Sequence, residues 1–288
     1  MSKSLATYLT LVLAVVFGWV WWSGFALEEF TEAEWVNLAL ITSIYLSSHI
    51  LRMMRLLLLT LDKRNNSFSV VVAHALTALP SSFLPYKLGE VLRLAAFMHA
   101  FDTRQKAIAI WLAERFGDVL VITFFIMTLY LLDIKVTPSM RAVFIIFMLV
   151  SVIGSLGLFG LANVFIFLNR HLVLTSLSPR GLLLLRYSHI LRSLETSIYR
   201  SLEGRVSGFL FLSVFIWFFE ILALSLFIRL MSIGETDFVE LFASGLLASV
   251  ASGSSNAFGM YQSFALVTLT IVFLPASWQA ARSKIIRN

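Results

Sequence analysis

The stretch Pro80-Ser-Ser-Phe-Leu-Pro-Tyr-Lys-Leu-Gly-Glu-Val-Leu-Arg93 decides the fold that the sequence predicts. It lies between two strongly apolar segments, yet it contains two prolines, one glycine, two serines and three charged side chains. Irregular backbone at membrane depth is tolerated only where protein or a water-filled cavity satisfies its N–H and C=O groups. Ionisable side chains at that depth are costly and mark functional sites. We therefore interpret the stretch as the tip of a re-entrant hairpin over about residues 66–98.

The composition indicates an integral membrane protein. Of the 288 residues, 59% are hydrophobic and 13% are charged, whereas soluble domains carry roughly 25% charged residues. Mean hydropathy is +0.89. The formal charge of +6 does not indicate nucleic-acid binding, because the basic residues cluster between apolar segments as the positive-inside rule predicts. Because the chain contains no cysteine, it has no disulfide framework, thiolate metal site or cysteine nucleophile.

Apolar length and loop charge predict a polytopic helix bundle. The predicted spans cover residues 5–26, 35–59, 107–132, 142–168 and 208–231. Residues 28–34 carry four acids and no base, so we place this loop outside and the N-terminus in the cytoplasm. The first span has no convincing signal-peptidase site, so we expect it to be retained. The arginine-rich segment 170–205 predicts a cytoplasmic amphipathic helix, with a solvated connector as the alternative.

A second hairpin is predicted over about residues 238–275. Residues 241–250 are apolar, residues 251–262 are small and polar, and the chain is then apolar again to residue 274. Interrupted helices that enter from opposite faces resemble the inverted repeats of secondary transporters. We therefore expect one all-α integral membrane domain over residues 1–288, with two re-entrant hairpins in an inverted-repeat-like arrangement. This topology places the basic tail outside, so either a final short helix turns inward or the hairpin assignment is wrong at that end.

The second predicted span carries a periodic basic pattern. His49, Arg52 and Arg55 recur every three residues and therefore occupy one side of a helix. One interpretation is that these side chains snorkel toward the cytoplasmic headgroups. The other is a basic wall that faces the interior of the bundle.

The third predicted span carries charges of both signs. Glu114 and Asp118 are i,i+4 neighbours, and Arg115 lies three residues before Asp118, so one ion-paired cluster is available. This cluster is either a structural clamp between helices or part of a binding site. Glu220 lies among apolar and aromatic residues of the last predicted span.

Two of these motifs resemble the lysylphosphatidylglycerol synthase transmembrane-region family, the flippase-like membrane part of multiple-peptide-resistance proteins. The residues that match the family pattern position for position are Pro85, Gly89, Glu90, Arg93, Glu114, Arg115 and Asp118. At the late break, the chain keeps Gly259 but has Gln262 where the family has an acid, and the family's proline is absent. The resemblance covers nearly the whole chain, although the last family span is truncated.

The resemblance implies two re-entrant hairpins around a central cavity and an activity that moves a lipid headgroup between leaflets. Many relatives are associated with glycan and glycolipid assembly, so the resemblance does not fix the lipid. The aminoacyl-transferase domain of the fused relatives is absent from this sequence, so we expect the chain not to synthesise the lipid it handles and not to be an enzyme.

Phosphate chemistry suggests roles for the candidate site. A half-helix that restarts near Pro85 would point its positive end and free N–H groups at the break, where a phosphate binds well. The candidate substrate-binding residues are Arg52, Arg55, Ser81, Ser82, Lys87, Glu90, Arg93, Glu114, Arg115 and Asp118. An anionic headgroup would be bound by Lys87, Arg93, Arg52 and Arg55, and the serines would add hydroxyl donors. The acids Glu90, Glu114 and Asp118 would form a compensating network that could also contact a cationic group such as an aminoacyl amine. Glu90 would hold Arg93 by an i,i+3 pair.

The predicted function is a lipid flippase for a phospholipid or polyprenyl-linked glycolipid in a bacterial or archaeal cytoplasmic membrane. The alternative is a non-transporting scaffold subunit for a glycosyltransferase or lipid synthase. An integral membrane enzyme ranks last, because Ser81, His74 and Glu90 have no catalytic spacing and no cluster has zinc spacing. We expect a membrane lipid as substrate, no cofactor and no nucleic acid. Envelope-glycan or lipid-synthesis enzymes and a homodimer stay open as partners. His74 is expected to be a packing histidine rather than a ligand-binding one.

Overall fold

The computed structural model describes most of the chain. The described residues are 3–23, 32–83, 88–101, 103–131, 141–142, 144–154, 160, 164, 167, 171, 179–230 and 256–282. Within these residues the structure is entirely helical, with no strand, which confirms the predicted all-α class for this part of the chain. The helices are α1 (Lys3–Ser23), α2 (Glu32–Leu59), η1 (Leu61–Lys63), α3 (Arg64–Phe83), α4 (Leu88–Ala100), α5 (Arg104–Leu131), α7 (Pro179–Leu202), α8 (Val206–Leu230) and α10 (Asn256–Arg282).

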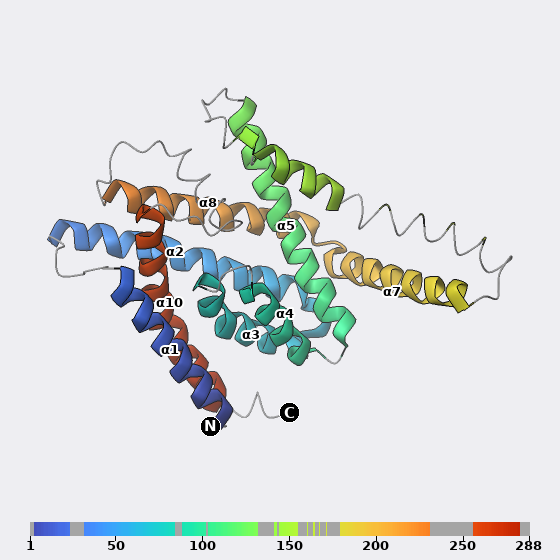
Figure 1. Cartoon of the computed structure of the whole chain (residues 1–288), viewed down its shortest axis with the longest axis horizontal. Helices are drawn as coiled ribbons and strands as arrows, with labels where there is room; N and C mark the ends of the chain where they lie inside the picture. The colour runs from blue at the N-terminus through green and yellow to red at the C-terminus, as the bar shows by residue number, and fades with distance from the viewer. Residues whose placement is uncertain are drawn as a thin grey trace.

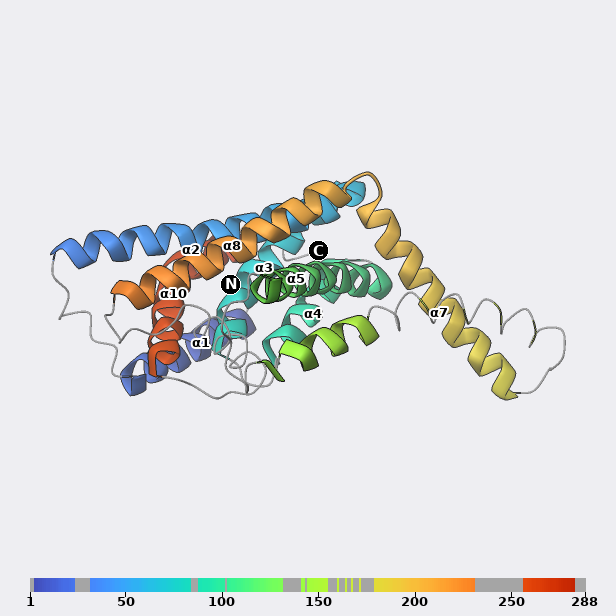
Figure 2. The ribbon, with the colours of Figure 1, turned by 90° about the horizontal axis from the view of Figure 1, so that it is seen from above.

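The most extensive contact between two helices is that of α2 with α8, which run side by side along the long axis of the molecule (Figures 1 and 2). The helix α5 crosses this pair and also contacts α4 and α7. On the other side, α10 packs against α3 and α1 (Figure 1). The indole nitrogen of Trp19 in α1 donates to the hydroxyl of Ser263 in α10 at 3.2 Å. The predicted spans in the first half of the chain therefore correspond to helices whose ends lie within a few residues of the predicted ones.

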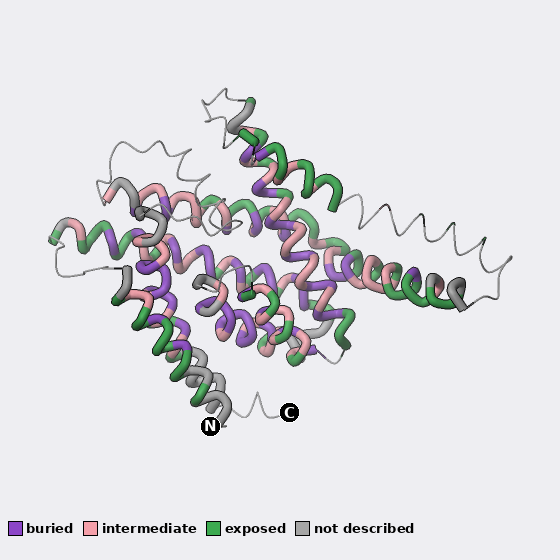
Figure 3. Tube along the Cα trace, in the orientation of Figure 1, coloured by how far each residue is buried: buried purple, intermediate pink, exposed green. Residues whose placement is uncertain are grey.

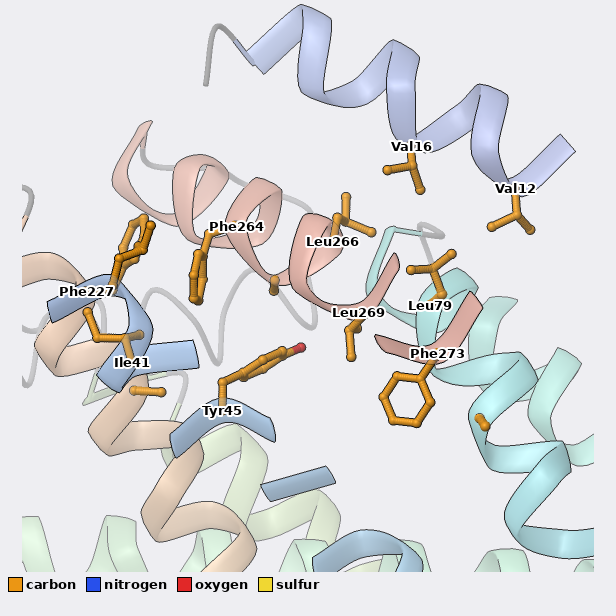
Figure 4. Close-up of a cluster of buried hydrophobic side chains, with 14 residues drawn as sticks. Val12, Val16, Ile41, Tyr45, Leu79, Phe227, Phe264, Leu266, Leu269 and Phe273 are labelled. Carbon is orange, nitrogen blue, oxygen red and sulfur yellow. The ribbon is translucent and has the colours of Figure 1, made fainter. Parts of the chain in front are cut away.

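Buried apolar side chains hold the helices together in three clusters. The largest lies where α1, α2, α3, α8 and α10 meet, and Figure 4 shows Tyr45, Phe227 and Phe264 within it. The centroids of the Phe227 and Phe264 rings are 5.1 Å apart. A second cluster joins α2, α3, α4, α5, α7 and α8 and includes Phe97, which is fully buried.

The described residues of the stretch 80–93 form the end of α3 and the start of α4, and these two helices pack against each other. A Cβ atom on Gly89 would lie 2.3 Å from the Cα of Ser81, so only glycine allows this approach of the two backbones. The prediction that Pro80 breaks the helix is wrong, because α3 continues through Pro80 to Phe83. Proline removes one hydrogen bond to the preceding turn, and a helix can continue past it. Residues 84–87 lie outside the described residues.

The second predicted hairpin agrees only in part with the structure. Residues 231–255 lie outside the described part of the chain, so its first arm and most of its break are not described. The helix α10 starts at Asn256, inside the predicted break of residues 251–262, and continues through Pro275 to Arg282. It has 27 residues and is therefore about 40 Å long, at 1.5 Å per residue. The final arm is therefore longer than the predicted short helix, because a single helix covers residues 256–282, and residues 283–288 lie outside the described part of the chain.

One described helix is long and apolar enough to cross a membrane, the segment Val206–Phe227 of α8, of which 22% is buried inside the protein. Shorter apolar helices cover Thr10–Trp21, Ser67–Leu79, Phe144–Gly154 and Met260–Pro275. Charged residues interrupt the apolar sequence of α2 and α5.

The predicted amphipathic segment forms α7, which leaves the bundle at the turn before α8 (Figure 2). Gly204 in this turn has a φ of 69°, a conformation that favours glycine. The C-terminal half of α7 packs on α5 through Leu194 and Ile198. Its N-terminal half is largely exposed (Figure 3), including Leu183 and Tyr187. The helical prediction is confirmed over residues 179–202, and its place at a lipid surface stays a prediction.

Candidate functional site

Ion-paired side chains from α2, α4, α5 and α8 meet inside the bundle. The four arginines are Arg52, Arg55, Arg93 and Arg115, and the four acids are Glu90, Glu114, Asp118 and Glu220. We call these eight residues the ion cluster. Because four positive charges face four negative ones, the cluster is neutral as a whole.

Arg55 is the centre of the ion cluster and its side chain is completely buried. One guanidinium nitrogen donates to Asp118 at 2.7 Å and to the Ser213 hydroxyl at 3.0 Å. The other donates to Glu114 at 2.9 Å. Of the two interpretations of the basic face of α2, a wall that faces the bundle interior therefore describes Arg55, and snorkelling does not. The α2 helix packs along α8, which turns this face inward.

Arg93 of α4 reaches the same centre. It donates to Glu114 at 2.7 Å, so a single carboxylate oxygen accepts from both Arg55 and Arg93. The predicted i,i+3 pair with Glu90 is present only at 4.0 Å, which is the limit of an ion pair. Glu114 therefore makes the shorter contact with Arg93, and the predicted i,i+3 pair with Glu90 is present as the longer one. Glu114 competes successfully because it is fully buried beside Arg93, whereas the Glu90 side chain retains 23% exposure.

Arg52 extends the ion cluster toward α8. Its guanidinium donates to Glu220 at 2.6 and 3.2 Å, and it lies 4.0 Å from Asp118. This contact spans 168 residues of sequence. The exposed fraction of the Arg52 side chain is 11%, so this arginine also faces inward.

Arg115 and Glu90 form the more exposed edge of the ion cluster. Their charged atoms are 3.2 Å apart, and Arg115 also lies 3.2 Å from Asp118, the ion pair predicted within α5. The Trp111 indole donates to Glu90 at 3.2 Å. The Arg115 side chain is 28% exposed, against 0% for Arg55 and Glu114. Charge is therefore accessible at this edge and enclosed at the centre.

Several polar atoms at the centre make no hydrogen bond with any residue that the structure describes. They include the Nε atoms of Arg55 and Arg93, and the Oε2 atom of Glu114. A guanidinium nitrogen can only donate and a carboxylate oxygen can only accept. The Oδ2 atom of Asp118 is also without such a bond, so the centre has two donors and two acceptors that a polar guest could use.

The structure brings together seven of the ten predicted site residues. Those seven are Arg52, Arg55, Glu90, Arg93, Glu114, Arg115 and Asp118. The Ser81 hydroxyl is buried at the α3–α4 approach and has no described partner. Lys87 and the side chain of Ser82 lie outside the described residues, so their predicted roles stay predictions.

Four further side chains belong to the surroundings of the ion cluster and were absent from the predicted site. Glu220 pairs with Arg52, Ser213 accepts from Arg55, and Trp217 donates to Asp118 at 3.2 Å. His74 was expected to be a packing histidine, but its Nδ1 atom lies 2.7 Å from a guanidinium nitrogen of Arg93. The isolated acid of Glu220 in an apolar span was the one signal that could have indicated its role.

The described residues contain no group of three or more His, Cys, Asp or Glu side chains that could hold a metal ion. A Ser81–His74 pair is not formed either, because the Ser81 hydroxyl and the Nε2 atom of His74 both have no partner in the described part of the chain. Ion pairing and hydrogen bonding are therefore the chemistry that this arrangement provides.

No protein-family model, curated protein or solved structure matches the chain. The resemblance of residues 84–93 and 113–118 to the lysylphosphatidylglycerol synthase transmembrane-region family stays a prediction that rests on those residues.

Proposed function

We propose that the chain is a polytopic membrane protein that moves an anionic lipid headgroup between leaflets, and that the ion cluster receives this headgroup. The observation that carries the proposal is the meeting of eight charged side chains between helices of a chain that is 59% hydrophobic, with Arg55 and Glu114 fully buried at the centre. A charge held at mid-bilayer costs at least ~2.5 kcal/mol on the lenient insertion scale. Fixed opposite charges lower this cost for a passing headgroup.

The edge formed by Arg115 and Glu90 supports an entry point. A lipid phosphate that reaches this edge can replace Glu90 as the partner of Arg115, because both are anions and the pair is partly exposed. The unpaired Nε atoms of Arg55 and Arg93 then offer further donors deeper in the protein. In this proposal α3 and α4 form the re-entrant hairpin, since α4 has 13 residues and at about 20 Å is too short for roughly 30 Å of hydrocarbon.

Buried ion pairs also argue against a purely structural role. Replacing a buried pair by well-packed apolar residues is often neutral or stabilising. A clamp between helices therefore gains little from arginines and acids, whereas a polar path requires them.

Reconstitution in liposomes tests the proposal. Wild-type protein is expected to give a chemical quencher access to fluorescent phospholipid from both leaflets, whereas the variants Arg93→Ala and Glu90→Gln leave the inner leaflet protected. The matched controls are Arg192→Ala and Glu195→Gln on α7, which lie outside the ion cluster and keep activity. Normal lipid movement in both site variants would remove the proposed site.

A scaffold subunit is the second candidate, and the exposed half of α7 favours it. Leu182, Leu183, Tyr187 and Ile190 are exposed on this half, together with Arg186. Such a mixed apolar and basic surface could bind a glycosyltransferase or lipid synthase. Purified protein that is well folded but moves neither a phospholipid nor a polyprenyl-linked glycolipid would favour the scaffold.

A further inference from the structure

Two buried histidines lie beside the ion cluster and belong to different helices. His49 is on α2 and His74 is on α3, and their ring centroids are 6.0 Å apart. Their exposed fractions are 7% and 1%. We call these two residues the histidine pair.

The contact with Arg93 determines the hydrogen-bonding role of His74. A guanidinium has donors and no acceptor, so the Nδ1 atom of His74 must accept the hydrogen bond at 2.7 Å from Arg93. The ring is then neutral and carries its proton on Nε2. This Nε2–H group is buried and has no partner among the described residues.

His49 has two nitrogens in the same condition. Neither its Nδ1 nor its Nε2 atom has a hydrogen-bond partner in the described part of the chain. A neutral His49 ring offers one donor and one acceptor. The histidine pair therefore presents two donors and one acceptor, and leaving such buried groups unpaired is costly, which points to a guest that satisfies them.

The surroundings of the histidine pair are aromatic. The Tyr45 ring lies 5.0 Å from His49, edge to face, and the Phe273 ring lies 5.6 Å from His49 and 6.5 Å from His74. Aromatic faces carry partial negative charge, which attracts the weakly positive C–H groups of a polyol or sugar. Phe273 belongs to α10, so the histidine pair lies where α2, α3 and α10 meet.

The chemistry of the guest follows from its donors and acceptors. An ammonium group only donates and could not use the His74 Nε2–H. A phosphate oxygen only accepts and could not use the acceptor nitrogen of His49. A hydroxyl group both donates and accepts, so it can accept from the His74 Nε2–H and donate to the acceptor nitrogen of His49.

We propose that His49 and His74 form a subsite for a hydroxyl group of a polyol or sugar headgroup. The proposal rests on the proposed function, since it places the phosphate of the same lipid at the ion cluster. It narrows the substrate class to anionic lipids whose headgroup carries hydroxyls.

Two lipids of equal charge test the subsite. Phosphatidylglycerol carries headgroup hydroxyls, and phosphatidylpropanol has the same charge and a similar length without them. Binding of each lipid to the purified full-length protein in detergent is measured by native mass spectrometry over a concentration series. The wild type is expected to prefer phosphatidylglycerol roughly two- to tenfold for each hydrogen bond gained.

Three variants identify the residues responsible. His49→Phe and His74→Phe are expected to bind both lipids equally, whereas His49→Gln keeps the preference because an amide also donates and accepts. His99→Phe is the matched control, since His99 bonds the carbonyl oxygen of Ala95 at 2.8 Å, away from the pair. Free glycerol phosphate in the same sample distinguishes a soluble ligand from a lipid, because the proposal predicts that it does not compete.

Equal binding of the two lipids by the wild type would overturn the subsite, and would mean that the histidine pair holds only water. A preference that survives in His49→Phe and in His74→Phe would overturn it as well. Selective binding without lipid movement in liposomes would refute the proposed function and leave the subsite standing. Lipid movement without a preference for phosphatidylglycerol would refute the subsite and leave the proposed function standing.

Discussion

Replacing Arg55 tests the energetics of the ion cluster. The change Arg55→Met keeps the apolar stem and removes the guanidinium, which makes hydrogen bonds of 2.7, 2.9 and 3.0 Å at a fully buried position. The ion cluster then has three arginines against four acids, and Asp118 and Glu114 each lose a charged hydrogen-bond partner. Removing one partner of a buried pair costs about 3–5 kcal/mol. We therefore expect the free energy of unfolding to fall by about this amount.

A second change should recover part of the loss. Arg55→Met combined with Asp118→Asn leaves three arginines against three acids, and the Asn side chain can still accept from the Trp217 indole. Contacting charged residues couple by roughly 0.5–3 kcal/mol, so the double variant should be more stable than the Arg55→Met single variant. The single variant Asp118→Asn is measured as well, which completes a double-mutant cycle.

Equilibrium unfolding in mixed micelles, followed by tryptophan fluorescence, measures these differences. The control is Arg192→Met on the exposed face of α7, which should change stability by less than about 0.5 kcal/mol. If Arg55→Met were no more destabilising than this control, the ion cluster would not exist as described. A double variant less stable than Arg55→Met would refute the charge-balance reasoning.

Three other predictions concern packing, topology and coupling. Gly89→Ala should destabilise the protein by about 1–3 kcal/mol, because its Cβ would meet the backbone of α3 at 2.3 Å. A Cβ atom added at Gly18 would have no atom within 4 Å, so Gly18→Ala should stabilise α1 by up to ~1 kcal/mol. A thermal unfolding temperature that is lower for Gly18→Ala than for Gly89→Ala would contradict the close approach of α3 and α4. Because the chain has no cysteine, a single introduced cysteine reports on which side of the membrane it lies. Glu29→Cys should react with an impermeant maleimide from outside the cell, and Arg192→Cys should react only after the cell is opened. The opposite pattern would show that the topology is inverted. Since Gln262 replaces the acid that the resemblance leads us to expect, lipid movement in liposomes should not change with an imposed pH gradient, and acceleration by the gradient would show proton coupling.

The sequence predicted the helices well, because apolar length and charged boundaries are local signals. The ends of α2 and α5 lie within three residues of the predicted spans. Pro80 was misleading, since a proline lowers helix stability without dictating where a helix ends. The start of α10 inside a small, polar segment was equally hidden, because packing against α3 and α1 determines it and composition does not.

The sequence also identified most of the charged residues of the site, but not their partners. Arg55 and Asp118 are 63 residues apart in sequence, and Arg52 and Glu220 are 168 apart. Only the packing of α2 along α8, with α5 crossing both, brings them together. The local pair of Glu90 with Arg93 was predictable from spacing, yet it is the weak one. The packing of helices that are distant in sequence determines which charged residues pair, and the periodicity of a single helix cannot predict that packing.

A cryo-EM map of the protein in a lipid nanodisc that contains phosphatidylglycerol tests the central claim most directly. The account predicts that the ion cluster lies within the hydrocarbon layer of the disc, with headgroup density beside Arg115 and Glu90. An ion cluster level with bulk water, with no lipid density at that edge, would contradict it.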